Sequence, residues 1–401
     1  MAPISRRTLL ASVLAAPLLI AGCASGTPGT VAETPPVPTE PPVETASLIV
    51  PGAFGPNGQH WPSRTPLRTD VFQYAIDVDP TWKAIGDAIT KANAAGATKT
   101  AVIRVRPGVL PGNGAGSSSA PVLSNIGETG RNTRVLVVPR DGAGTVTLSN
   151  SIRFDRVRGV SFIGFWTYPY SVVFSAAQDF AWAWSKGQAF NISANSTEPT
   201  KNIELVECVT PDGRLTEGDV WGFRTAGQVM EGVSVIGCYL APSFKPAGSD
   251  AHCDTLQFSG THPVSGARIK DSVIFASTNA AVIPFDRAVD ITFDRNLIVG
   301  GDRMLQRFPL PDEANQFTSG FPSAVNGSGT VDILSAQDSV FIGAMRGVWK
   351  SAVRSTVSLA NPPKATSGSF TSDVGLSTIG PEWLDEQSPL PTDQRLLAIW
   401  T

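Results

Sequence analysis

The chain repeats a short phrase, and this repeat constrains the fold more than any other feature. The run Gly159–Gly164 (GVSFIG) returns as Gly232–Gly237 (GVSVIG), and shorter copies begin at Ile203, Ala267 and Ile291. The copies lie about 24 to 43 residues apart and alternate apolar with polar residues, which is typical of strands with one buried face. Repeats of this size build stacked units around a continuous core, so the sequence predicts stacked coils of β-strands joined by loops of variable length.

A second strand aligns in each coil, upstream of the repeated phrase. Its four copies are Ala189–Ile192, Val220–Phe223, Thr255–Phe258 and Val282–Phe285. The alternation predicts that one residue of each copy points inward, namely Phe190, Trp221, Leu256 and Ile283. The predicted fold is therefore all-β, a right-handed parallel β-helix.

The segment that precedes the repeats is predicted to cover the N-terminal end of the β-helix. Trp82, Ile85, Ile89 and Ala92 form one face of a short helix, and the strand 100–106 with the turn Pro107-Gly108 follows. This pattern resembles the capping helix and first rung of pectate-lyase-like β-helix proteins, and the resemblance extends from about residue 70 to about residue 379. It implies the fold alone, because the motifs of polygalacturonases and of other specific enzyme families do not match.

The N-terminus reads as an export signal. Arg6-Arg7 and the apolar run 9–20 form a twin-arginine signal, and Ile20-Ala21-Gly22-Cys23 resembles a lipoprotein box. We expect residues 1–22 to be a signal peptide, Cys23 to carry lipid, residues 23–48 to form a Pro/Thr-rich tether and residues 49–401 to fold as the β-helix. The expected location is the outer face of the cell membrane. An ordinary signal peptide with an incidental cysteine is the alternative.

Composition excludes several classes of function. The net charge of −3 and the lack of basic runs argue against nucleic-acid binding, and no phosphate-binding loop or dinucleotide fingerprint occurs. Cys208 and Cys238 align on neighbouring coils. We favour buried free thiols over a disulfide, because twin-arginine substrates fold in a reducing compartment.

The alignment also stacks polar residues into columns. We expect four catalytic candidates, Glu217, Asp219, His252 and Asp254, and four substrate-binding candidates, Lys186, Arg224, Gln257 and Asp286. Two stacked carboxylates require a raised pKa, a neighbouring cation or a bound metal ion, and the first two are what general acid–base catalysis uses. Asp254 can face outward only if the chain turns just after it, since an unbroken strand would point Asp254 and Leu256 to the same side.

The string His252-x-Asp254-x-x-Gln257 resembles a strand motif seen in many pectate-lyase-like proteins. The alternative is a ladder of hydrogen-bonded polar residues without chemistry. A further expectation concerns Trp182 and Trp184, which would stack on sugar rings if they point outward and would pack beneath a long loop if they do not.

Metal ligands are sparse, and no cofactor is predicted. The sequence shows no His/Cys ligand spacing, although Ca²⁺ would find oxygen ligands at Glu217, Asp219 and Asp254.

Three functions fit these residues. The first is a surface enzyme that hydrolyses an extracellular polysaccharide, with Asp254 and either Glu217 or Asp219 as the acid–base or nucleophile pair. The second is a polysaccharide lyase, with Lys186, Arg224 or His252 as the base and a cation in the acidic patch. The third is a glycan-binding or cell-wall-binding lipoprotein without catalysis. The expected partners are a polysaccharide and, through Cys23, the lipid membrane.

Overall fold

The computed structural model describes residues 54–194, 197–285, 287–315, 317, 322–327 and 334–397. The expected signal peptide, Cys23, the tether and Asp286 lie outside these residues. The described residues belong to one compact unit. Within it, no helix has the length and apolar character needed to cross a membrane.

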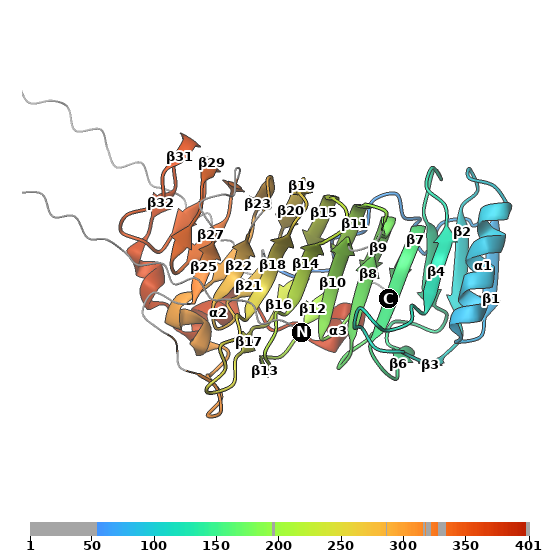
Figure 1. Ribbon diagram of the computed structural model, residues 1–401, viewed down its shortest axis with the longest axis horizontal. Coiled ribbons are helices and arrows are strands. Elements are labelled where there is room, and N and C mark those ends of the chain that lie inside the picture. Colours follow the sequence, from blue (N-terminus) through green and yellow to red (C-terminus); the bar gives the residue numbers. More distant parts are fainter. Residues whose placement is uncertain are drawn as a thin grey trace, which may run out of the picture. The chain divides into compact units, whose positions relative to one another are not determined.

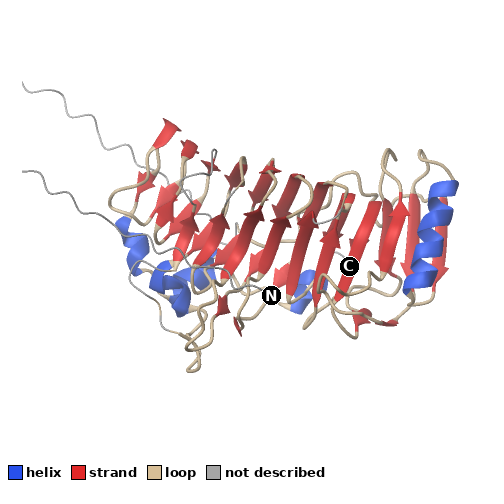
Figure 2. Cartoon of the chain, viewed as in Figure 1, coloured by secondary structure: helices blue, strands red, loops and turns tan. Residues whose placement is uncertain are grey.

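The described chain winds into coils whose strands stack in three parallel ladders (Figures 1 and 2). A typical coil contributes β14 (Trp221–Thr225) to the first ladder, β15 (Met230–Ile236) to the second and β16 (Tyr239–Leu240) to the third. Each strand pairs in parallel with its counterparts in the neighbouring coils. The predicted parallel β-helix is confirmed.

The element bounds follow this division. The first ladder contains β4 (Leu123–Gly127), the first half of β7 (Ile152–Ile163), β8 (Ser171–Ser175), β10 (Ala189–Ala194), β14, β18 (Asp254–Gly260), β22 (Ala280–Pro284), β25 (Ser323–Asn326) and β28 (Met345–Arg346). The second contains β1 (Tyr74–Val78), β2 (Ala101–Val105), β5 (Val135–Pro139), the second half of β7, β9 (Gln178–Ala183), β11 (Thr200–Val206), β15, β19 (Val264–Ser265), β20 (Ala267–Lys270), β23 (Ile291–Asp294), β26 (Leu334–Gln337), β29 (Trp349–Val353) and β31 (Ala365–Gly368). The third contains β12 (Val209–Thr210), β16, β21 (Val273–Phe275), β24 (Leu297–Val299), β27 (Val340–Ile342), β30 (Thr356–Val357) and β32 (Thr371–Ser372).

The remaining elements are short. Two small strand pairs are β3 (Gly108–Leu110) with β6 (Val146–Leu148) and β13 (Arg214–Leu215) with β17 (Ser243–Phe244). The helices are α1 (Trp82–Ala94), η1 (Gly301–Gln306), η2 (Val374–Thr378), α2 (Pro381–Gln387) and α3 (Asp393–Leu397).

The repeated phrase lies in the second ladder, where its copies pair as expected. Ile203 pairs with Val233, and Ala267 pairs with Ile291. Between Val160 and Ile203 the structure inserts one more rung, β9, whose Phe180 pairs with both. This extra rung explains why those two copies lie farthest apart in the sequence.

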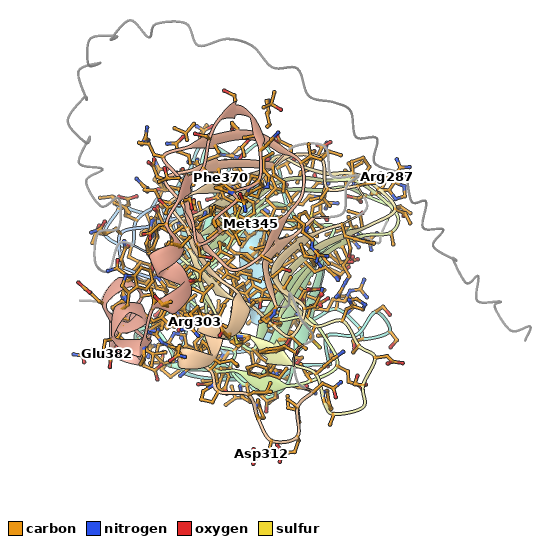
Figure 3. All side chains as sticks on the ribbon, turned by 90° about the vertical axis from the view of Figure 1, so that its left-hand side faces the viewer. Arg287, Arg303, Asp312, Met345, Phe370 and Glu382 are labelled. Carbon is orange, nitrogen blue, oxygen red and sulfur yellow. The ribbon has the colours of Figure 1, made fainter. Side chains whose placement is uncertain are left out.

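The apolar core runs along the inside of the coil. In the end-on view of Figure 3, Met345 and Phe370 lie inside the cross-section, whereas Arg287 and Asp312 lie at its edge. Stacked aromatic residues fill much of this interior. Phe154 and Phe174, for example, are parallel with ring centroids 6.0 Å apart. Such stacks repeat because the ladder places equivalent side chains one strand spacing apart.

One predicted register is wrong by a single residue. Leu256 pairs with Val282, not with Ile283, and Gln257 pairs with Ile283. Val282 is therefore the core partner of Leu256 in β22, and Asp254 pairs with Ala280. The error arises because β22 is buried throughout, so its sequence carries no alternation that would fix the phase.

Helix α1 covers the N-terminal end of the coil, as predicted. Thr81 caps the helix by accepting a hydrogen bond from the Ala84 N–H, and the predicted face of Trp82, Ile85, Ile89 and Ala92 is buried. The helix packs against β1, β2, β4 and β5. It protects strand edges that would otherwise be open to pairing with another chain.

The segment 54–72 lies along the outer face of the second ladder. Trp61 and Phe72 pack there on residues such as Val102, Leu136 and Ile163. His60 fixes the segment: its Nδ1 lies 2.6 Å from Oε1 of Glu207, and its Nε2 lies 2.9 Å from Oδ2 of Asp271. The part of this face around Val102, Leu136 and Ile163 is therefore a second apolar layer beneath the segment.

The cysteines of the described residues are buried. Cys208, Cys238 and Cys253 are free thiols. Sγ of Cys208 lies 3.3 Å from the Trp182 carbonyl, and Sγ of Cys238 lies 3.4 Å from the Leu205 carbonyl. The prediction of free thiols on neighbouring coils is confirmed.

Candidate active site

One register position of the first ladder faces outward in successive coils. Its neighbours in sequence, such as Phe174 and Phe258, point into the core, so this position points to solvent. Strand pairing links its members through β7, β8, β10, β14, β18, β22, β25 and β28. We call them the outer row: Arg153, Val173, Asn191, Gly222, Gln257, Ile283, Asn326 and Arg346.

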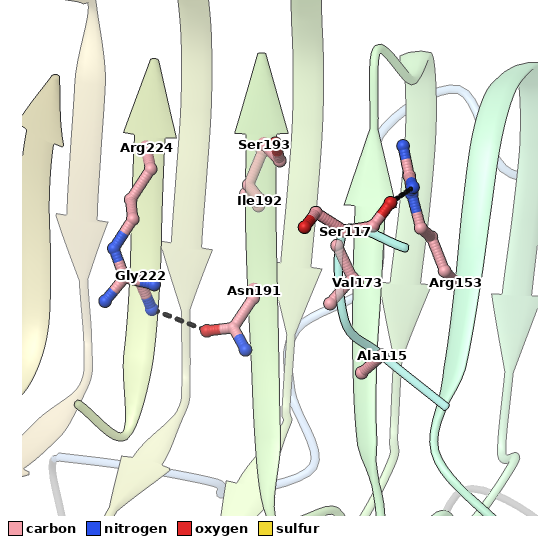
Figure 4. A pocket seen from close by; sticks show the side chains of 9 residues that line it. All are labelled: Ala115, Ser117, Arg153, Val173, Asn191, Ile192, Ser193, Gly222 and Arg224. Atoms are coloured by element: carbon pink, nitrogen blue, oxygen red, sulfur yellow. Dashed lines mark hydrogen bonds between the residues drawn. The ribbon is translucent and has the colours of Figure 1, made fainter. Parts of the chain in front are cut away.

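Two cavities open along the outer row. The larger, about 540 Å³, is the Asp254 cavity, and its wall is made by His252, Asp254, Gln257, Asn279, Ile283, Phe285, Asn326, Gly327 and Arg346. The smaller, about 210 Å³, is the Arg224 cavity, and its wall is made by Ala115, Ser117, Arg153, Val173, Asn191, Ile192, Ser193, Gly222 and Arg224 (Figure 4). The Nε of Arg224 donates to Oε1 of Gln257 at 3.2 Å, so a direct hydrogen bond connects the two walls.

Asp254 is the most perturbed carboxyl group of this face. Its side chain is 0% exposed yet forms part of the cavity wall. Oδ1 accepts a hydrogen bond from Nδ2 of Asn279 at 2.7 Å, and Oδ2 is buried without a hydrogen-bond partner in the described part of the chain. Burial, followed by the negative charge of Asp219, raises the pKa of Asp254 to about 7, although the Asn279 amide opposes the shift. Asp254 is therefore a carboxyl group that can hold a proton near neutral pH.

Strand β18 does not alternate regularly at its start. Asp254 and Gln257, three residues apart, both line the outer cavity, whereas Leu256 and Phe258 are core residues. Between them, Thr255 is buried, with its hydroxyl 2.8 Å from that of Ser277. The turn predicted directly after Asp254 is not present, because β18 runs unbroken from Asp254 to Gly260. The Asp254 carboxyl group nevertheless lines the outer cavity.

Asp219 lies beside Asp254 but has a different environment. Its side chain is 6% exposed, its Oδ1 accepts a hydrogen bond from the Asp254 N–H at 2.9 Å, and its Oδ2 forms an ion pair with Arg224. Burial raises the pKa of Asp219, and the Asp254 N–H and the Arg224 charge act against that shift. Both oxygens are engaged, and Asp219 is not part of the Asp254 cavity wall. It therefore acts on Asp254 and not on a bound molecule.

Gly222 allows Arg224 to fold back across its own strand. A Cβ at position 222 would lie 2.8 Å from the Arg224 guanidinium. Figure 4 shows the Arg224 side chain lying over Gly222 in this way. Sequence reasoning missed Gly222, and also Arg153, Asn326 and Arg346. These residues share the outward position of the first ladder, and they can be grouped only once the pairing register of its strands is known.

Two expected site residues, Lys186 and Glu217, lie away from both cavities. Lys186 pairs through its backbone with Val209 of the third ladder, its Nζ binds Asp393 at 2.9 Å, and it lines neither cavity. Glu217 is exposed and contributes to neither cavity wall. Asp286 lies outside the described residues.

Of the two alternatives for Trp182 and Trp184, the structure shows burial and not an outward-facing platform. Trp182 is 0% exposed and belongs to the core, and Trp184 is 1% exposed beneath the segment 54–72, where its Nε1 donates to the His60 carbonyl. Trp184 has a φ of 53°, which turns it out of the strand alternation, and the overlying segment then buries it. Neither ring is available to stack on a sugar.

Metal binding receives no support from the geometry. Among the residues that the structure describes, no group of three or more His, Cys, Asp or Glu side chains is arranged to hold a metal ion. At the Ca²⁺ site considered from the sequence, Asp219 is engaged by Arg224 and Glu217 lies outside the cavity.

Comparison with known proteins gives distant matches only. No family model and no curated protein matches the chain. Among solved structures, alginate lyase from Paenibacillus sp. str. FPU-7 is 10% identical over 75% of this chain and 99% of its own, with a TM-score of 0.23. The mannuronan C-5 epimerase AlgE4 A-module of Azotobacter vinelandii is 10% identical over 75% of this chain and 100% of its own, with a TM-score of 0.24. Likeness of this degree assigns no activity, so the function is argued below from the site.

Proposed function

We propose that this protein is an enzyme that cleaves an acidic polysaccharide by β-elimination in the Asp254 cavity. One observation carries the proposal. A buried carboxyl group that holds its proton near pH 7 shares a cavity with an imidazole, a guanidinium and three side-chain amides. A proton donor, a proton acceptor and a carboxylate-binding cation are what β-elimination next to a uronic carboxylate requires.

Each residue has a role in the proposed reaction. Arg346, with the amides of Asn326 and Gln257, binds the sugar carboxylate and makes the neighbouring C5–H more acidic. His252 removes the C5 proton, the electron pair of that bond forms the C4–C5 double bond, and the C4–O4 bond breaks. Asp254 gives its proton to the departing O4. Proton exchange with solvent then returns Asp254 and His252 to their starting states.

Glycoside hydrolysis is the second candidate, because Asp219 and Asp254 are two neighbouring carboxyl groups with raised pKa values. Hydrolysis needs two carboxyl groups on either side of the scissile bond. Among the described residues that line the cavity, Asp254 is the one carboxyl group, and both Asp219 oxygens are engaged. Asp219 and Asp254 are therefore better suited to giving Asp254 a raised pKa than to acting as two catalytic carboxyl groups.

The outer row supports a polymer as the substrate. From Arg153 in β7 to Arg346 in β28 it crosses seven strand spacings, about 34 Å at about 4.8 Å each. The proposal includes export and anchoring through Cys23, which would bring the enzyme to polymers outside the cell.

The test is a panel of acidic and neutral polysaccharides with product analysis. We expect acidic polymers to yield products with an ultraviolet-absorbing double bond, and we expect a chelator to leave the rate unchanged. Asp254→Asn should abolish the signal, and Arg104→Gln, at an exposed ion pair far from the site, serves as the matched control. Products with new reducing ends but no ultraviolet absorbance would show that the reaction is hydrolysis and not elimination. Binding without any cleavage would make the protein a glycan-binding module.

A further inference from the structure

A loop covers one end of the outer row. The loop 111–121 joins β3 to β4, and two of its residues, Ala115 and Ser117, line the Arg224 cavity together with Val173. Figure 4 shows this loop crossing in front of β8. A polymer lying on the outer row would meet the loop there.

The loop is held by its main chain. The Gly114 N–H donates to the Ser151 carbonyl at 2.8 Å, and the Ser117 carbonyl accepts a hydrogen bond from Nη1 of Arg153 at 2.8 Å. At Gly112 a Cβ would lie only 2.3 Å from the Asn150 carbonyl oxygen, so the backbones approach too closely for any side chain. These contacts make the loop a fixed part of the Arg224 cavity wall.

The outer row also ends at this point. The position before Arg153 in the register belongs to Val122, whose N–H donates to the Arg153 carbonyl at 2.8 Å and which directly follows the loop. The N-terminal end of the coil beyond it is covered by α1. The row therefore offers no continuation for a bound polymer past Arg153.

The Arg224 cavity contains two guanidinium groups; Arg224 is ion-paired with Asp219, and Arg153 donates to the Ser117 carbonyl. Arg153 and Arg224 both line the Arg224 cavity, and no carboxylate occurs among the described residues of its wall. Asn191 and Ser193 add neutral hydrogen-bonding groups. Guanidinium groups beside amide and hydroxyl groups suit a sugar that bears a carboxylate or a sulfate.

The distance from this end to the proposed reaction centre is short. Four strand steps, through β14, β10 and β8, separate Asp254 in β18 from Arg153 in β7, which is about 19 Å. One sugar residue of an extended polymer advances by about one strand spacing. About four sugar residues therefore fit between the two positions.

From this arrangement we infer that the Arg224 cavity binds the terminal acidic sugar of the polymer and that the loop 111–121 stops the chain there. The enzyme then releases short oligosaccharides of one size from a chain end and does not cut at random inside the chain. This inference rests on the proposed function for the cleavage step. It adds that the Arg224 cavity is the subsite for the terminal sugar, that this sugar is acidic, and that the product has a fixed length.

A pair of glycine variants tests the covered end on the polysaccharide that the wild-type protein cleaves. Gly112→Ala forces the loop away from β7, whereas Gly116→Ala meets only ordinary contacts and is the matched control. We expect the wild type and Gly116→Ala to release oligosaccharides of about four residues from the start, with a slow fall in viscosity. Gly112→Ala should give mixed sizes and a rapid fall in viscosity. Mixed sizes from the wild-type protein would overturn the inference and leave the proposed function standing.

Binding tests the subsite without catalysis. In full-length Asp254→Asn protein, calorimetry with acidic oligosaccharides of two to eight residues should show affinity that rises with length and then levels off. Adding Arg153→Gln should weaken binding of the longer oligosaccharides at least tenfold, and adding Arg104→Gln should not. Equal binding with and without Arg153 overturns the subsite. Binding that depends on Arg153, from a protein that yields no unsaturated product, upholds the subsite and overturns β-elimination.

Discussion

The main-chain N–H of Asp254 donates to Oδ1 of Asp219 at 2.9 Å, so the carboxylate of one coil caps the strand that carries the carboxyl group of the next. The contact holds a negative charge beside Asp254, and that charge adds to burial in raising the Asp254 pKa to about 7. The stacking of two carboxylates thereby produces one acid that keeps its proton at neutral pH.

Asp254→Asn should lower the activity of the protein but raise its thermal stability at alkaline pH. Loss of a general acid lowers the rate by about 10²- to 10⁴-fold, and the wild-type rate should fall as the pH rises through about 7. Because the folded-state pKa lies above the unfolded value, the wild type loses stability as the pH rises from about 4 through about 7. Calorimetry should therefore find the variant more stable by about 2–5 °C at pH 8 and nearly equal to the wild type at pH 4. The same difference at both pH values would contradict a buried, protonated Asp254.

Asp219→Asn should shift the pH profile of activity. The amide oxygen still accepts the Asp254 N–H, but the negative charge is gone, so the pKa of Asp254 falls and the alkaline limb moves down by about one pH unit. Initial rates between pH 5 and pH 9 measure the shift. Glu217→Gln removes an equal charge two residues away, outside the cavity, and should leave the profile in place. A profile that moves equally in both variants would mean that Asp219 has no special relation to Asp254.

Gly222→Ala should impair the site while the fold remains intact. The added methyl group displaces the Arg224 guanidinium, which then loses Asp219 and Gln257, and we expect kcat/KM to fall about tenfold. Gly218→Ala is the control, because a Cβ there meets nothing within 4 Å. Circular dichroism and thermal unfolding should match the wild type for both variants. Unchanged kinetics of Gly222→Ala would mean that the contacts of Arg224 with Asp219 and Gln257 do not support the site.

The His60 contact should make stability depend on pH above neutrality. Burial opposes the charge of His60, but its hydrogen bonds to Asp271 and Glu207 outweigh burial and raise the pKa to about 9. The stabilisation is complete below about pH 6.5 and is lost as the pH rises through about 9, with a size on the order of 2 kcal/mol. Urea unfolding at pH 6 and pH 9.5 should show this loss in the wild type and a much smaller one in His60→Gln. A wild-type stability that is constant over this range would argue against a charged His60.

The sequence predicts the ladders well where alternation is strong and fails where it is absent. Val160, Ile203 and Val233 alternate with polar residues, so both their strands and their pairing could be predicted. In β22 every position is buried, and the predicted partner of Leu256 was Ile283 where the structure has Val282. When a strand is apolar on both faces, its sequence does not show which residues point inward and which point outward.

Part of the candidate site follows from the same alignment. Asp219, Arg224, Asp254 and Gln257 could be grouped because they lie beside well-aligned strands. Arg346 could not, because it lies past the last recognisable repeat, on a strand of two residues. The burial of Trp184 was equally hidden, since it depends on a segment more than a hundred residues upstream that covers the ladder from outside.

The outer row has an evolutionary consequence. Its members are chemically unrelated, and main-chain pairing alone sets their spacing, so a coil gained or lost between β7 and β10 would leave Asp254 and its neighbour Asp219 untouched. Such a change would move the loop 111–121 by about one sugar residue relative to the scissile bond. Relatives with different numbers of coils should therefore release oligosaccharides of different lengths, with the coil stack serving as a molecular ruler.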